Sequence, residues 1–117
     1  MSYQEAMEAD GAEVLAYQTF GDYQGTWIAK VKYGGVVGWV SGSYGSCSQC
    51  DAFESEFDGS YEDEPNIKER LALFGRSYLQ HMMTAEEAIK DAEKDIVDEW
   101  DEEDAARRIA FVKENSK

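Results

Sequence analysis

Apolar and polar residues alternate in three short segments of the first half of the chain. The alternation is clearest over residues 26–33 (TWIAKVKY), where every second side chain from Trp27 to Tyr33 is apolar or aromatic. Residues 13–20 (EVLAYQTF) and 36–41 (VVGWVS) show a weaker form of the same pattern. Because successive side chains of a strand point to opposite faces of a sheet, this period of two predicts three β-strands.

Glycine-rich turns separate the predicted strands. Gly34-Gly35 lies between the second and third strands, and this dipeptide tolerates the positive φ angles of a two-residue hairpin turn. The segment 21–25 begins and ends with glycine and marks the other turn. Short turns join antiparallel neighbours, so we expect a three-stranded antiparallel meander.

Apolar residues recur every three or four positions in the second half of the chain, which is typical of amphipathic helices. The first stripe follows the only proline, Pro65, a residue suited to the first turn of a helix. It comprises Ile67, Leu71, Phe74, Tyr78 and Met82. Gly75 within it weakens the helix by about 1 kcal/mol relative to alanine, unless it allows close packing on the sheet. Thr84 and Glu87 have the spacing of a capping box and predict the start of a second helix.

The end of the chain allows two interpretations. The stripe of the second helix comprises Ile89, Ala92, Ile96 and Trp100. Asp101 is then expected to cap a third helix, with Ala105, Ile109 and Val112 directed inward. The alternative is one bent helix that continues through Trp100.

The segment between the strands and the helices is rich in glycine and serine. Ser46 or Ser48 is expected to cap a short helix that places Phe53 and Phe57 on one face. The predicted fold is therefore α+β, a three-stranded antiparallel meander packed with two or three helices. The predicted single domain, 1–117, comprises a β-rich part (13–41), a Cys-containing connector with a short helix (42–58) and a helical acidic part (65–115).

Composition adds a strong negative charge to this picture. The chain has 117 residues, with 25 acidic against 11 basic side chains, a net charge of −14 and a pI near 4.3. A field of this sign repels nucleic acid and anionic membranes and attracts basic surfaces. Solubility or a halophilic origin would also account for the charge. A hydrophobic fraction of 43% is enough for a modest core.

We expect neither a signal peptide nor a membrane-spanning segment in this sequence. Residues 1–10 are polar and acidic, with neither the basic flank nor the apolar run of a signal peptide. No stretch approaches the roughly 20 apolar residues of a membrane span. We therefore expect a cytoplasmic protein without membrane contact, whose two cysteines are reduced.

Acidic residues gather in two runs, which are the strongest functional signal in the sequence. The segment 51–64 holds seven acids and no base, and the segment 86–104 holds eleven acids and two lysines. On one helix the second run would span about 28 Å, close to one net charge per ~3 Å, a spacing like that of DNA phosphates. Its Glu87, Asp91, Asp95, Asp98 and Glu102 would then line one face. The predicted partner-binding residues are Glu54, Glu56, Asp58, Glu62, Asp63, Glu64, Glu87, Asp91, Asp95, Asp98 and Glu102.

Residues for catalysis or metal binding are sparse. The single histidine, His81, lies near the end of the first predicted long helix, a position that favours a packing or helix-terminal role over a general base. Cys47-x-x-Cys50 is interpreted first as a pair of packed structural thiols, and its spacing also fits a zinc half-site or a redox pair. With His81, and Asp51 as a fourth ligand, it makes an incomplete zinc set. We expect no cofactor and no enzymatic activity, and keep the cysteine pair as an alternative metal-stabilised or redox module.

Two segments carry a resemblance to known proteins. The segment 42–51 (GSYGSCSQCD), followed by Phe53, and the later segment 83–88 (MTAEEA) resemble small uncharacterised proteins of tailed-phage genomes. That resemblance implies a sheet-like first half carrying the cysteine pair and a helical acidic tail, and it brings no catalytic residue. In size and charge the chain is also similar to phage anti-restriction and anti-CRISPR proteins that imitate DNA.

These observations favour a binding protein over an enzyme. Clustered carboxylates would occupy a Lys/Arg-lined groove of a host nucleic-acid-binding protein or ribonucleoprotein and displace its nucleic acid. The expected partner is therefore a basic protein surface, and direct contact with nucleic acid is not expected. Oligomeric state cannot be predicted from these features.

Overall fold

Three strands form the central sheet in the order in which they occur in the chain. In this computed structural model, which describes residues 2–21, 25–45, 51–57, 60–61, 63–94 and 99–116, β1 (Glu13–Gly21) pairs with β2 (Gly25–Tyr33). β2 pairs in turn with β3 (Val36–Tyr44), and both pairings are antiparallel. Gly34 and Gly35 have φ angles of 61° and 79°, which glycine adopts at little cost. The predicted meander and its hairpin turn are confirmed.

The third strand is longer than the sequence pattern predicted. Its pairing with β2 continues through Gly42, opposite Trp27, to Tyr44, opposite Gly25. Residues 42–44 therefore belong to the sheet and not to the connector. A Cβ at Gly42 would lie 2.7 Å from the indole of Trp27, so the close approach of this strand to Trp27 requires glycine here.

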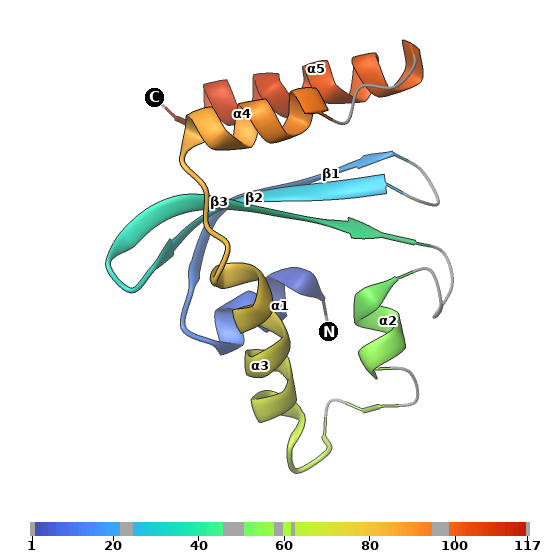
Figure 1. The fold of residues 1–117 in the computed structure, drawn as a ribbon. Helices are drawn as coiled ribbons and strands as arrows, with labels where there is room; N and C mark the ends of the chain where they lie inside the picture. The colour runs from blue at the N-terminus through green and yellow to red at the C-terminus, as the bar shows by residue number, and fades with distance from the viewer. Residues whose placement is uncertain are drawn as a thin grey trace.

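Five helices in the described part of the chain cover both faces of the sheet (Figure 1). They are α1 (Tyr3–Ala9), α2 (Ala52–Phe57), α3 (Ile67–Leu79), α4 (Ala85–Lys94) and α5 (Glu99–Glu114). The first three lie against one face, and α4 and α5 lie side by side against the other. The fold class is α+β as predicted, with helices in two layers and the sheet between them.

The larger core cluster lies between the sheet and the layer of α1, α2 and α3. Trp27, Ala29 and Val31 are almost completely buried there, on the side of β2 that the alternation predicted. Tyr3 and Tyr78 contact the ring of Trp27 with centroid distances of 5.2 Å each. At about 25 cal/mol per Å² of apolar surface removed from water, these aromatic side chains contribute much of the stabilisation of this layer.

The second core cluster lies on the opposite face of the sheet. Ile28 and Trp39 are buried there with Phe20 against Ala88 of α4 and Val112 of α5. The chain reaches this face through the segment between α3 and α4, which runs past the outer edge of β3. Met83 in this segment exchanges two backbone hydrogen bonds with Trp39, at 2.8 and 2.7 Å.

The first helix, α1, was not predicted. The backbone N–H of Glu5 donates to the Ser2 hydroxyl, which caps the helix, and Ala6 and Met7 are fully buried. A Cβ on Gly75 of α3 would lie 2.2 Å from the carbonyl oxygen of Ala6. Gly75 therefore permits the backbones of α1 and α3 to approach, and the predicted close contact is with α1 and not with the sheet.

The predicted helix starts are correct in one case and wrong in three. α3 begins at Ile67 with Asn66 at its N-cap, so Pro65 lies before its first turn. The capping box is confirmed, because Thr84 N–H donates to Glu87 Oε1 at 3.1 Å and Glu87 N–H donates to Thr84 Oγ1 at 3.2 Å. Asp51, and not a serine, caps α2, since it accepts from the N–H groups of Phe53 and Glu54. α5 begins at Glu99, two residues before Asp101.

Two of the three expected inward positions of the last helix are confirmed. Ala105 and Val112 of α5 are completely buried, and Ile109 is half-buried. Ile96 lies outside the described residues. None of the described helices is long and apolar enough to cross a membrane.

Candidate functional site

One carboxylate of the first acidic run, that of Asp51, has a structural role inside the fold. Asp51 is buried, and its carboxylate accepts hydrogen bonds from the Tyr3 hydroxyl at 2.5 Å and from the N–H of Gly45 at 2.9 Å. It also caps α2 through Phe53 and Glu54. This carboxylate joins three separate parts of the chain and is not available to a partner.

The hydrogen bonds around Asp51 determine its ionisation. Burial alone would raise the pKa of this carboxyl, but the bonds from Tyr3, Gly45, Glu54 and Phe53 outweigh burial and lower the pKa below the usual aspartate value. Burial and the bond to Asp51 raise the pKa of the Tyr3 phenol. The pair is therefore a carboxylate with a neutral phenol, a structural arrangement and not an acid–base couple.

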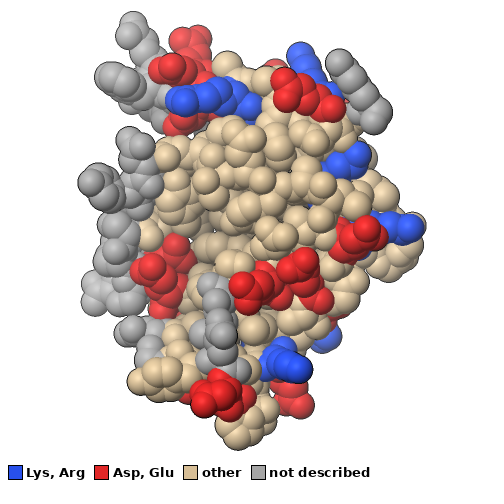
Figure 2. All heavy atoms as spheres, turned by 180° about the vertical axis from the view of Figure 1, so that it is seen from behind, with Lys and Arg blue, Asp and Glu red and all other residues tan. Residues whose placement is uncertain are grey.

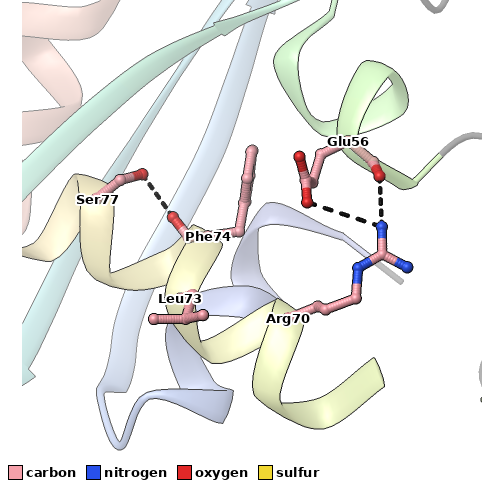
Figure 3. A pocket seen from close by; sticks show the side chains of 5 residues that line it. All are labelled: Glu56, Arg70, Leu73, Phe74 and Ser77. Carbon is pink, nitrogen blue, oxygen red and sulfur yellow. Dashed lines mark hydrogen bonds and ion pairs between the residues drawn. The ribbon is translucent and has the colours of Figure 1, made fainter. Parts of the chain in front are cut away.

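Two more carboxylates of this run are held by Arg70 of α3. Its guanidinium lies 3.7 Å from Glu56 Oε1 (Figure 3). It also lies 3.4 Å from Glu64 Oε2 and covers the ring of Phe57 at 5.1 Å. It also donates to the backbone carbonyl of Glu56 at 2.6 Å. Glu56 and Glu64 therefore link α2 to α3, and their charge is locally compensated.

An open pocket adjoins this ion pair. Its volume is about 270 Å³, and it is lined by Glu56, Arg70, Leu73, Phe74 and Ser77 (Figure 3). Leu73 is 62% exposed at its rim. The guanidinium, its one cation, is already bound by carboxylates, so we assign the pocket no ligand.

The remaining acids of the first run have mixed outcomes. Glu54 and Asp63 are exposed on the surface, as a partner-binding role requires. Asp58 and Glu62 lie outside the described residues. The run therefore does not act as a unit, because its members serve the core, an ion pair and the surface separately.

The second acidic run is divided between two helices. α4 ends at Lys94 and α5 starts at Glu99, so the continuous 28 Å face predicted for residues 86–104 does not form on a single helix. Glu87 is held in the capping box, whose bonds from Thr84 lower its pKa. Asp91 and Glu102 are exposed, whereas Asp95 and Asp98 lie outside the described residues.

The two helices form an antiparallel hairpin in which α5 projects beyond α4 (Figure 1). Arg108 donates to the carbonyl of Ala92 at 3.1 Å, which fixes the register near the end of α4. Nine residues of α5 precede Arg108, or about 14 Å of helix, while only about 3 Å of α4 follows Ala92. The first turns of α5 therefore extend past the last turn of α4 (Figure 1).

Charge is distributed unevenly along this hairpin. Residues 91–104 contain nine acids and one lysine, a net charge of −8. Two bases just beyond these residues bind to the same end, because Arg107 pairs with Asp104 at 2.8 Å and Arg108 donates to the carbonyl of Ala92. With both included the net charge of this end is −6, and the rest of the hairpin, residues 85–90, 105–106 and 109–114, has three acids and two bases, a net charge of −1. We call residues 91–94 and 99–104 the acidic end of the hairpin; its described exposed carboxylates are Asp91, Glu93, Glu102 and Glu103.

Elsewhere the carboxylates are dispersed. Figure 2 shows several separate acidic groups over the face opposite to that of Figure 1, with lysines and arginines between them and a broad area without charged side chains in the centre. The two acidic runs do not merge into one continuous patch on this face. On this face, therefore, the described acids are not concentrated into one area.

The metal alternative stays a prediction. Cys47 and Cys50 lie outside the described residues. His81 is exposed in the turn that follows α3, where its backbone N–H donates to the carbonyl of Tyr78 at 3.0 Å. Of its two expected roles, packing is therefore wrong and a position at the end of the helix is confirmed. Within the described part of the chain, no group of three or more histidine, cysteine, aspartate or glutamate residues is arranged to hold a metal ion.

Sequence reasoning missed the polar contacts that α1 makes. Asp10, at the end of α1, pairs with Arg76 of α3 at 2.8 Å and accepts from the Tyr33 hydroxyl at 2.6 Å. These bonds lower the pKa of Asp10, with the bond from Arg76 as the largest cause. The spacing Ser2-x-x-Glu5, which is that of a capping box, was the signal that would have revealed the helix.

Comparisons with known proteins provide no evidence about function. No protein family model matches the chain, and no curated protein or solved structure matches it either. The resemblance to phage proteins therefore stays a prediction.

Proposed function

We propose that this protein is a binding protein and inhibitor whose acidic hairpin end occupies a Lys/Arg-lined nucleic-acid-binding surface of a partner protein. The supporting observation is the division of charge along the α4–α5 hairpin, −6 at one end with Arg107 and Arg108 included, and −1 at the other. A field concentrated at a projecting helix end steers a basic surface toward that end and orients the encounter.

The projection of α5 gives the acids access to a concave partner. The first turns of α5 extend beyond the end of α4, so their exposed carboxylates can reach into a groove of the partner. The exposed Glu102 and Glu103 lie on this projection. Acids in the first turns also suit the positive end of the helix dipole, which stabilises the projecting turns in the free protein.

A competition experiment tests this function. The protein is immobilised, exposed to a bacterial lysate treated with nuclease, and eluted with duplex DNA at constant ionic strength. Nucleic-acid-binding proteins should be retained and released by the DNA, because both ligands use the same basic surface. Retention should fall steeply with salt. If DNA releases nothing that salt alone would not release, the protein does not compete with nucleic acid and the proposal fails.

A further inference from the structure

The two outer edges of the sheet differ in the hydrogen bonding of their outward backbone groups. Residues of β3 whose backbone groups point away from β2 alternate with those that pair with it. Among the outward residues, Trp39 pairs with Met83 through two hydrogen bonds, and the carbonyl of Ser43 accepts from the Tyr3 hydroxyl at 3.1 Å. The β3 edge is therefore closed at Trp39 and, through its carbonyl, at Ser43.

Among the residues that the structure describes, none closes the β1 edge in this way. The Gly34-Gly35 turn fixes which pairs of β2 and β3 are hydrogen-bonded, and from them the alternation assigns the outward backbone groups of β1 to Val14, Tyr17, Thr19 and Gly21. The structure gives the backbone N–H and C=O of Tyr17 and Thr19 no hydrogen bond within the described chain.

The devices that usually protect a sheet edge are sparse on β1. The strand contains no lysine and no proline, and its only charge is Glu13 at the start. A bulge at Leu15 interrupts the register between Val14 and Ala16, which leaves residues 16–21 as a regular edge. In Figure 1 the closed edge of β3 faces the viewer, so β1 lies toward the viewer in Figure 2, where the central area without charged side chains is seen.

We infer that β1 is a docking edge for an extended, Lys/Arg-containing segment of the partner, which adds to the sheet as a fourth strand beside residues 16–21. Backbone pairing would supply the geometry of the contact, and the acids would select the sequence. The choice of a basic segment rests on the proposed function, whereas the open edge does not.

The acidic hairpin end lies within reach of such a segment. Thr26 of β2 pairs with Phe20 of β1 and contacts Arg108 of α5 at 3.4 Å. Asp104 precedes Arg108 by one helical turn, and Figure 1 places the start of α5 above the end of β1. A strand beside residues 16–21 therefore runs toward the acidic end. A second copy of this chain is disfavoured as occupant, because each copy carries a charge of −14.

Two synthetic peptides test the inference. One is the nonapeptide Lys-Thr-Lys-Val-Lys-Thr-Lys-Val-Lys, and the other has the same sequence with N-methyl groups on the alternate amides that would pair with β1. Both have the same charge, so electrostatic attraction alone predicts equal affinity. We expect the unmodified peptide to bind at least tenfold more tightly, and at saturation to slow hydrogen exchange of the Tyr17 and Thr19 amides at least tenfold. Equal affinities, or unchanged exchange of both amides, would overturn the inference.

Matched proline variants of the protein separate edge pairing from folding. Thr19→Pro removes an outward N–H of β1, and Val37→Pro removes an outward N–H of the opposite edge, where proline is equally tolerated. Circular dichroism checks both folds. Only Thr19→Pro should abolish the preference for the unmodified peptide, and loss in both variants would contradict the assignment. If Thr19→Pro fails to fold, the exchange measurement on the unaltered protein decides.

Two further measurements separate this inference from the proposed function and from self-association. Glu102→Lys with Glu103→Lys should weaken both peptides alike and leave their ratio unchanged, so a failure of the hairpin role does not remove the edge. Sedimentation of the free protein should show a monomer. A dimer that Thr19→Pro dissociates would assign the edge to a second copy and overturn the choice of partner.

Discussion

At the scale of single residues, identical side chains have different roles according to what surrounds them. Asp51 is buried and accepts four hydrogen bonds, whereas Asp91 is exposed on α4. Sequence reasoning counted both as members of acidic runs. No local pattern distinguishes them, because the donors to Asp51 include Tyr3, forty-eight residues away.

Asp51→Asn should destabilise the fold by about 1–3 kcal/mol, since it weakens a helix cap and a buried charge-assisted bond. Chemical denaturation at pH 7 measures this loss, and the exposed Glu54→Gln is a control expected to change stability by less than about 0.5 kcal/mol. Equal stability of Asp51→Asn and the unaltered protein would contradict the structural role.

The carboxyl of Asp51 should also make the free energy of unfolding depend on pH. Because folding lowers the pKa of Asp51, its contribution is fully present above the unfolded pKa, about 3.9, and is lost as pH falls through the folded pKa. The difference in unfolding free energy between Asp51→Asn and the unaltered protein should therefore shrink below about pH 4. A difference that stays constant from pH 7 to pH 3 would show that the charge is not involved.

At the scale of helices and strands, several local signals were reliable, although the expected serine cap of α2 and Asp101 cap of α5 were wrong, and long-range contacts were not predicted. The alternation around Trp27, the Gly34-Gly35 turn and the Thr84–Glu87 box are local, and each predicted its element correctly. The second core cluster around Trp39 was not predicted. It depends on the crossing of the chain past β3 at Met83, and no pattern within ten residues encodes that crossing.

Gly75→Ala tests the contact between α1 and α3. Alanine favours an isolated helix by about 1 kcal/mol, but here the added methyl would meet the Ala6 carbonyl. We expect a net loss of about 1–3 kcal/mol in thermal or chemical unfolding, as for other overpacked sites. Ser77→Ala, on the exposed side of α3, is the matched control and should be nearly neutral. A stabilised Gly75→Ala variant would contradict the close approach of the two helices.

Thr84→Ala tests the start of the α4–α5 layer. It removes the hydroxyl that accepts from Glu87 N–H, and should cost about 1 kcal/mol in unfolding free energy. Glu86→Gln, beside the box and exposed, serves as the comparison. Equal losses in the two variants would indicate that the capping box does not stabilise α4.

At the scale of the whole molecule, the sheet separates two helical layers in which the acidic side chains have different roles. In the α1–α3 layer, Asp10, Asp51, Glu56 and Glu64 are bound within the fold. In the α4–α5 layer the acids collect at a projecting end. Net charge predicted a basic partner from composition alone, but the location of the acidic end depends on the hairpin, which the sequence left open as one bent helix or two.

The most direct test compares two variants of equal net charge. Asp91→Lys, Glu102→Lys and Glu103→Lys together reverse the hairpin end, and Glu8→Lys, Glu69→Lys and Glu114→Lys together reverse exposed acids elsewhere. Each set changes the net charge from −14 by +6 to −8. Affinity for a partner released by DNA is measured for both at one ionic strength. The hairpin variant should lose at least tenfold more affinity than the other, and equal losses would show that overall charge, not its position on α4 and α5, determines binding.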